Sequence, residues 1–91
     1  MDPGAIRFQG RWKEQLVIST PLGGAVVEMT MGELHVYFPM ETRWRSLAPQ
    51  ALREKWAAIH GALVAWCATE RIPLTVDEQA WVTADIQQGP A

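Results

Sequence analysis

The segment from Trp56 to Ala68 constrains the fold most strongly, because it contains no Asp, Glu, Lys or Arg. It lies inside a longer stretch, Ser46 to Arg71, whose pattern predicts a helix. A helix at a protein surface normally carries charges on its outer face. We therefore expect this helix to be covered by its own sheet and also by a terminal segment, a second copy of the chain or a partner.

Length and composition indicate one domain over residues 1–91, with residues 1–10 and 87–91 loose. The hydrophobic fraction of 48% and charged fraction of 20% are typical of globular proteins. A net charge of -2 gives no strong attraction to nucleic acid or anionic lipid. The chain has one cysteine, Cys67, no long apolar run and no signal-peptide pattern, so we expect a cytoplasmic protein that does not enter a membrane.

Three β-strands are predicted in the first half of the chain, where β-branched and aromatic residues are frequent. They lie at Gln15–Thr20, Ala25–Thr30 and Glu33–Phe38. A segment near the N-terminus, Ala5–Phe8, is a candidate for a further edge strand.

The register of these strands follows from their apolar residues, since one face of the sheet must be buried. We pair Thr20 with Ala25 and Met29 with Leu34, which makes an antiparallel meander with its second strand in the centre. The side chains that then share the buried face are Leu16, Ile18, Val27, Met29, Leu34, Val36 and Phe38.

The long helix is predicted to begin at Ser46, a favourable N-cap, with Pro49 in its first turn. It must end by Arg71, because the residue before Pro73 is driven out of the helical conformation. Its apolar stripe should lie on the buried sheet face. This stripe consists of Leu52, Trp56, Ile59, Leu63, Trp66 and Cys67.

A short fourth strand is predicted at Leu74–Val76, at either edge of the sheet. Asp77 can then cap a C-terminal helix that runs through Trp81 towards Ile86. The resulting fold class is a two-layer α+β domain of order β-β-β-α-β-α.

The back of the long helix is the first candidate for a binding surface. Ala57, Gly61 and Ala65 are spaced by four and project together, which allows another backbone to approach closely. With Trp81 nearby, this face is a candidate for binding a protein partner or a second copy. The alternative is that the C-terminal helix covers it within one chain.

The outer face of the sheet is the second candidate. The predicted register places Glu28 opposite His35 and Val26 opposite Tyr37. A Glu beside a His can form an acid–base or pH-sensitive pair, and Tyr37 with His35 suits a small-ligand patch. The alternative is an ordinary cross-strand pair on a wet face.

The third candidate is Arg43-Trp44-Arg45, placed just before the expected N-cap. Free N–H groups at a helix start favour anions, so this corner is a candidate site for a phosphate, a carboxylate or an acidic loop. The alternative is a solvated loop in which Trp44 fills the end of the core.

No ligand-spacing pattern predicts a metal, and no motif predicts a cofactor. His60 and Cys67 are about 10.5 Å apart along a helix, too far for a dyad, so we expect a buried, inert Cys67. The sequence favours a small non-enzymatic interaction module, which a homodimer would fit. A binder of a small or anionic ligand is the second interpretation, and an enzyme using Glu28 and His35 is the third.

Overall fold

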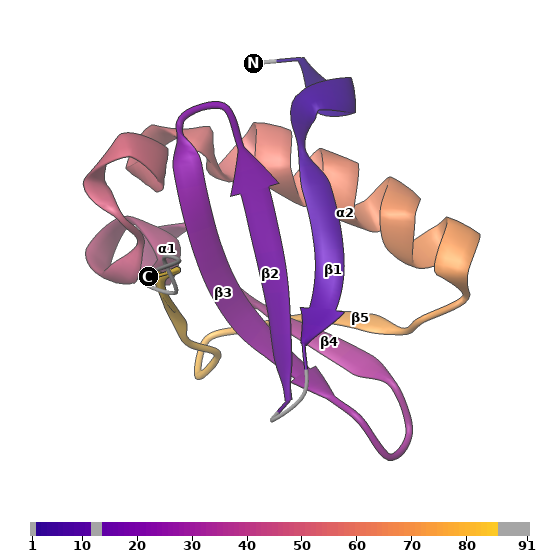
Figure 1. The fold of residues 1–91 in the computed structure, drawn as a ribbon. Helices are drawn as coiled ribbons and strands as arrows, with labels where there is room; N and C mark the ends of the chain where they lie inside the picture. Colours follow the sequence, from indigo (N-terminus) through magenta and orange to yellow (C-terminus); the bar gives the residue numbers. More distant parts are fainter. Residues whose placement is uncertain (1, 12–13, 86–91) are drawn as a thin grey trace, which may run out of the picture.

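The computed structural model describes residues 2–11 and 14–85 (Figure 1). These residues form an α+β fold, as predicted, with more strands than expected. The elements in chain order are η1 (Pro3–Ala5), β1 (Arg7–Arg11), β2 (Gln15–Thr20), β3 (Gly23–Thr30), β4 (His35–Pro39), α1 (Glu41–Leu47), η2 (Gln50–Lys55), α2 (Trp56–Glu70), β5 (Leu74–Asp77) and β6 (Val82–Ala84), where η denotes a 3₁₀ turn.

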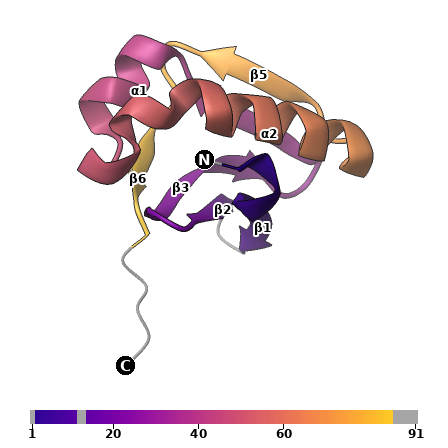
Figure 2. The ribbon, with the colours of Figure 1, turned by 90° about the horizontal axis from the view of Figure 1, so that it is seen from above.

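The strands form one sheet in which β1 to β4 are consecutive antiparallel neighbours. Strand β5 joins β4 in parallel, and β6 pairs with β3. The predicted meander is therefore present, extended by β1 at one edge. The sheet curls so that α2 lies between the β1–β3 part and β5 (Figure 2).

Both hairpin registers differ from the prediction by two residues. Ile18 pairs with Ala25 in the first hairpin, and Met29 pairs with Val36 in the second. An even shift keeps every side chain on its face, so the predicted buried face survives except at one position. Leu34 precedes β4 and is 44% exposed, so its assignment to the core is wrong.

The first shift follows from a tighter turn than expected. The Thr20 hydroxyl donates a hydrogen bond to the carbonyl of Gly23 (2.8 Å) and accepts one from the N–H of Leu22 (3.0 Å). Gly23 has φ of 138°, which a glycine adopts without strain. Two residues therefore connect the strands, and Thr20 pairs with Gly23 instead of Ala25.

The predicted helix from Ser46 is interrupted, and Ser46 is not its N-cap. Ser46 lies inside α1. This helix ends before Ala48, because Ala48 has an extended backbone (ψ 155°). The ring of Pro49 disfavours a helical conformation at the preceding residue, which explains the break. The predicted end is confirmed, since Arg71 has a left-handed conformation (φ 59°) and closes α2.

The core joins the inner face of the sheet to one side of α2. Four residues of the predicted stripe, Leu52, Ile59, Leu63 and Cys67, are buried. Trp56 and Trp66 are half-buried and pack against the same cluster. The Trp56 Nε1–H donates to the carbonyl of Pro39 (2.8 Å), which satisfies its polar atom at the core margin.

The predicted C-terminal helix is wrong, because Val82–Ala84 forms strand β6. The carboxylate of Asp77 accepts the N–H of Gln79 (2.7 Å) in a turn, instead of capping a helix. Strand β4 pairs only with positions 28–30 of β3, and β6 pairs with positions 25–27. The new strand thus satisfies backbone groups that β4 leaves open. Residues 87–91, predicted to be loose, lie outside the described residues.

Residues 1–10 were also predicted to be loose, and this is wrong for the described residues among them, because residues 2–11 contain η1 and β1. The candidate edge strand at Ala5–Phe8 is present, shifted to Arg7–Arg11, and it pairs with β2. None of the helices in residues 2–11 and 14–85 has the length and apolar character needed to cross a membrane.

Candidate functional site

The outer face of β3, β4 and β5 is the first candidate surface for a ligand, because polar side chains line two depressions on it. In the observed register Glu28 lies opposite Tyr37, and His35 lies opposite Thr30. The predicted pairing of Glu28 with His35 is therefore wrong, because the hairpin is shifted by two residues. The acid–base interpretation loses its geometric basis.

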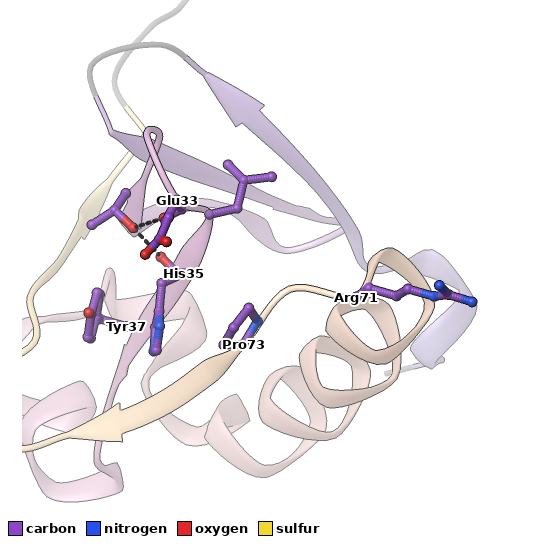
Figure 3. A pocket seen from close by; sticks show the side chains of 7 residues that line it. Glu33, His35, Tyr37, Arg71 and Pro73 are labelled. Carbon is purple, nitrogen blue, oxygen red and sulfur yellow. Dashed lines mark hydrogen bonds between the residues drawn. The ribbon is translucent and has the colours of Figure 1, made fainter.

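His35 and Tyr37 form a stack on this face. Their ring centroids are 4.4 Å apart with planes inclined by 13° (Figure 3). The His35 Nε2 lies 2.8 Å from the hydroxyl of Thr75 on the neighbouring strand β5. The ring of His35 is thus held from two directions, and it fixes one side of the Tyr37 ring.

Two depressions flank Tyr37. The larger, of about 700 Å³, lies on the His35 side (Figure 3). Its lining consists of Thr30, Glu33, Leu34, His35, Tyr37, Arg71 and Pro73. Figure 3 shows the Arg71 side chain pointing away from the stacked rings, so it adds no positive charge beside them.

The smaller depression, of about 240 Å³, lies on the other side of Tyr37. It is lined by Glu28, Thr30, Tyr37, Asp77, Gln79 and Ala80. Two carboxylates from different strands therefore face an aromatic ring. Thr75 and Asp77 were not predicted as site residues. The alternation of strand β5 places both on the face of Tyr37, but the parallel pairing of β5 with β4 was not predicted.

The back of α2 forms a second candidate surface, which we call the α2 strip. Its residues are Ala57, Gly61, Val64, Ala65 and Ala68, and all five are exposed. Val64 is 46% exposed. Trp81 is half-buried just before β6, so the helix that was to bring it over the strip does not exist. The alternative that a C-terminal helix covers the strip is therefore wrong.

An apolar depression of about 500 Å³ borders the α2 strip. It lies at the surface between α2 on one side and η1 and β1 on the other. Ala65 and Trp66 line it from α2. Phe8 lies on the opposite side, with its ring centroid 5.6 Å from that of Trp66. The strip is thus continuous with a hollow that exposes parts of two aromatic rings.

The Arg43-Trp44-Arg45 corner does not converge on a common site. Trp44 is 0% exposed and donates its Nε1–H to the carbonyl of Leu52 (2.8 Å), as the core-filling alternative expected. Arg43 donates to the carbonyl of Ala80. Arg45 is paired with two carboxylates, Glu41 at 3.2 Å and Glu54 at 3.5 Å. Since these residues lie within α1, the expected helix start behind them is absent, and anion binding stays a prediction.

Cys67 is buried, as predicted, with 3% exposed. Desolvation by this burial raises the pKa of its thiol to about 11. His60 instead stacks on Trp56, with ring centroids 4.6 Å apart. The described residues contain no cluster of three or more His, Cys, Asp or Glu side chains that could hold a metal ion.

Comparisons with known proteins add no family. No protein-family model matches the chain, and neither a curated protein nor a solved structure matches it. The function proposed below is therefore inferred from the surfaces of this chain alone.

Proposed function

We propose that the protein is a small non-enzymatic interaction module that forms a homodimer through the α2 strip. The strip carries no charge, and its members are small or apolar. A helix face of this kind normally lies against another surface, while exposed helix faces carry charges. In the described residues no element of the same chain covers it, so a second chain is the natural cover.

The main support for this proposal is the presence of a glycine, Gly61, at an exposed position in the interior of α2. A glycine in a helix interior costs about 1 kcal/mol relative to alanine. Gly61 lies in the middle of α2, and a Cβ placed on it would have no atom outside its own helix within 4 Å. Packing within the chain therefore gives no reason for a glycine here. Close approach of a partner helix gives one.

A second copy fits this strip because the pattern is symmetric about Gly61. Ala57 and Ala65 lie four residues to either side of it. A two-fold axis at Gly61 would place Gly61 against Gly61 and Ala57 against Ala65 of the second chain, an isologous contact. Residues spaced by four form the ridges that pack most often between helices.

The aromatic hollow beside the strip supplies further apolar area. Trp66 and Phe8 border it, and tryptophan is enriched in the cores of protein interfaces. A partner that covers the strip would also reach this hollow, because Ala65 belongs to both.

The test replaces Ala65 with Glu and measures mass by sedimentation equilibrium alongside circular dichroism. We expect Ala65→Glu to abolish dimerisation while the spectrum stays unchanged, because a charge is costly only where it is desolvated. Ala51→Glu is the matched control, since Ala51 is an exposed alanine on η2 outside the strip. If both variants dimerise alike, the strip is not the interface.

A further inference from the structure

A different surface supports a second inference, independent of the dimer. Tyr37 separates the two depressions on the outer face of the sheet. His35 stacks against one side of its ring at 4.4 Å. The hydrogen bond between the His35 Nε2 and the Thr75 hydroxyl holds that stack in place. The smaller depression adjoins Tyr37 away from the stack, so the aromatic wall is positioned before any ligand arrives.

Two carboxylates line the smaller depression beside Tyr37. Glu28 comes from β3, directly across from Tyr37, and Asp77 comes from the end of β5. Within the described residues, neither carboxylate has a cation of the same chain within 4.0 Å. Arg43 donates its Nε–H to the carbonyl of Ala80, a residue of the depression's lining, and not to either carboxylate. The charge of this depression is therefore left for a ligand to balance.

The volume of the smaller depression limits the size of the ligand that it can hold. Its volume is about 240 Å³. Pockets for drug-sized molecules occupy about 300–1,000 Å³, so this one suits a single side chain better than a whole metabolite. The depression of about 700 Å³ on the far side of Tyr37 offers room for the residues that flank that side chain.

We propose that this outer face docks a protein segment by inserting an arginine side chain between Tyr37, Glu28 and Asp77. A guanidinium is planar, stacks on aromatic faces and donates to carboxylates in a fixed fork. It would place its plane on the Tyr37 ring and its N–H groups toward the two carboxylates. Phosphate-bearing partners, including nucleic acid, are disfavoured by the same carboxylates.

The test is an amide-resolved NMR titration with a capped peptide, Gly-Gly-Arg-Gly-Gly, against a counterpart with Gln in place of Arg. We expect shifts at Glu28, Tyr37 and Asp77 with the Arg peptide alone. Glu28→Gln should weaken binding about tenfold, since charged hydrogen bonds are the stronger kind. Glu70→Gln removes the same charge at the exposed end of α2 and should leave affinity unchanged.

Two further measurements test whether the Tyr37 ring is needed and whether the ligand is a peptide segment or free arginine. Tyr37→Phe keeps the ring and should keep binding, while Tyr37→Leu should lose it. Free arginine should bind more weakly than the peptide, and equal affinity would overturn segment docking in favour of a small-molecule site. The proposal also fails if the Gln peptide binds equally, or if Glu28→Gln and Glu70→Gln weaken binding alike.

Discussion

Replacing Gly61 with alanine separates the stability of the chain from its assembly. The backbone at Gly61 is helical, and the added methyl group meets no atom outside its own helix within 4 Å. The substitution should therefore stabilise the monomer by about 0.5–1 kcal/mol, because alanine loses less backbone entropy than glycine on folding. The same methyl group enters the closest point of the proposed dimer contact.

The two effects have opposite signs and separate assays. Urea unfolding at low protein concentration, where the chain is monomeric, should give a midpoint raised by about 0.3–1 M. Sedimentation equilibrium should show a dimer weakened about tenfold, since a methyl group forced into a packed contact costs about 1–3 kcal/mol. Ala65→Gly is the control, and it should lower the midpoint by a similar amount.

A lowered urea midpoint for Gly61→Ala would refute this reasoning. It would mean that position 61 is packed against another part of the same chain. A raised midpoint with unchanged assembly would leave the fold as described and place the interface elsewhere.

Four further predictions concern the core, Cys67 and the first hairpin. Leu63→Ala should cost about 2–5 kcal/mol in chemical unfolding, whereas exposed Val64→Ala should change stability by under about 0.5 kcal/mol. Native Cys67 should react slowly with thiol reagents at neutral pH; rapid labelling would contradict its burial. With the folded-state pKa of Cys67 raised to about 11, its contribution to stability should be lost as pH rises from about 9 to about 11, measured as the difference between wild type and Cys67→Ala. Thr20→Val should destabilise the first hairpin by about 1 kcal/mol in urea unfolding, because it removes the turn hydrogen bonds.

Local patterns predicted the layers of this fold well. The agreement of the apolar residues across the two hairpins placed Leu16 and Ile18 on the buried face of β2, and both are fully buried. The helical stripe of Ile59 and Leu63 was found in the same way. These features depend on periods of two and 3.6 residues, which a two-residue change of register leaves intact.

Long-range pairing was the part that the sequence did not reveal. Val82–Ala84 becomes a strand only because β3 extends beyond β4 and offers free backbone groups. The stretch from Asp77 to Trp81 resembles the start of a helix, but the residues after it pair with β3 and form a strand instead. The outer-face site depends on the same unpredicted geometry, since Asp77 reaches Tyr37 only through the parallel pairing of β5 with β4.

The candidate surfaces were predicted to different extents. Ala57, Gly61 and Ala65 were identified from spacing alone, because a helix face is a local property. Their exposure was not predicted, because it depends on whether the C-terminal segment with Trp81 covers this helix face. The mistaken pairing of Glu28 with His35 came from the turn at Met31 to Leu34. Four residues connect β3 to β4 there, and β4 begins at His35, two residues later than expected.

The solution mass of the wild-type chain, measured by sedimentation equilibrium from low to high micromolar concentration, tests the central claim most directly. The proposed dimer predicts a mass that rises with concentration from 10.2 kDa toward twice that value. A mass that stays at 10.2 kDa at the highest concentration would contradict self-association through the α2 strip.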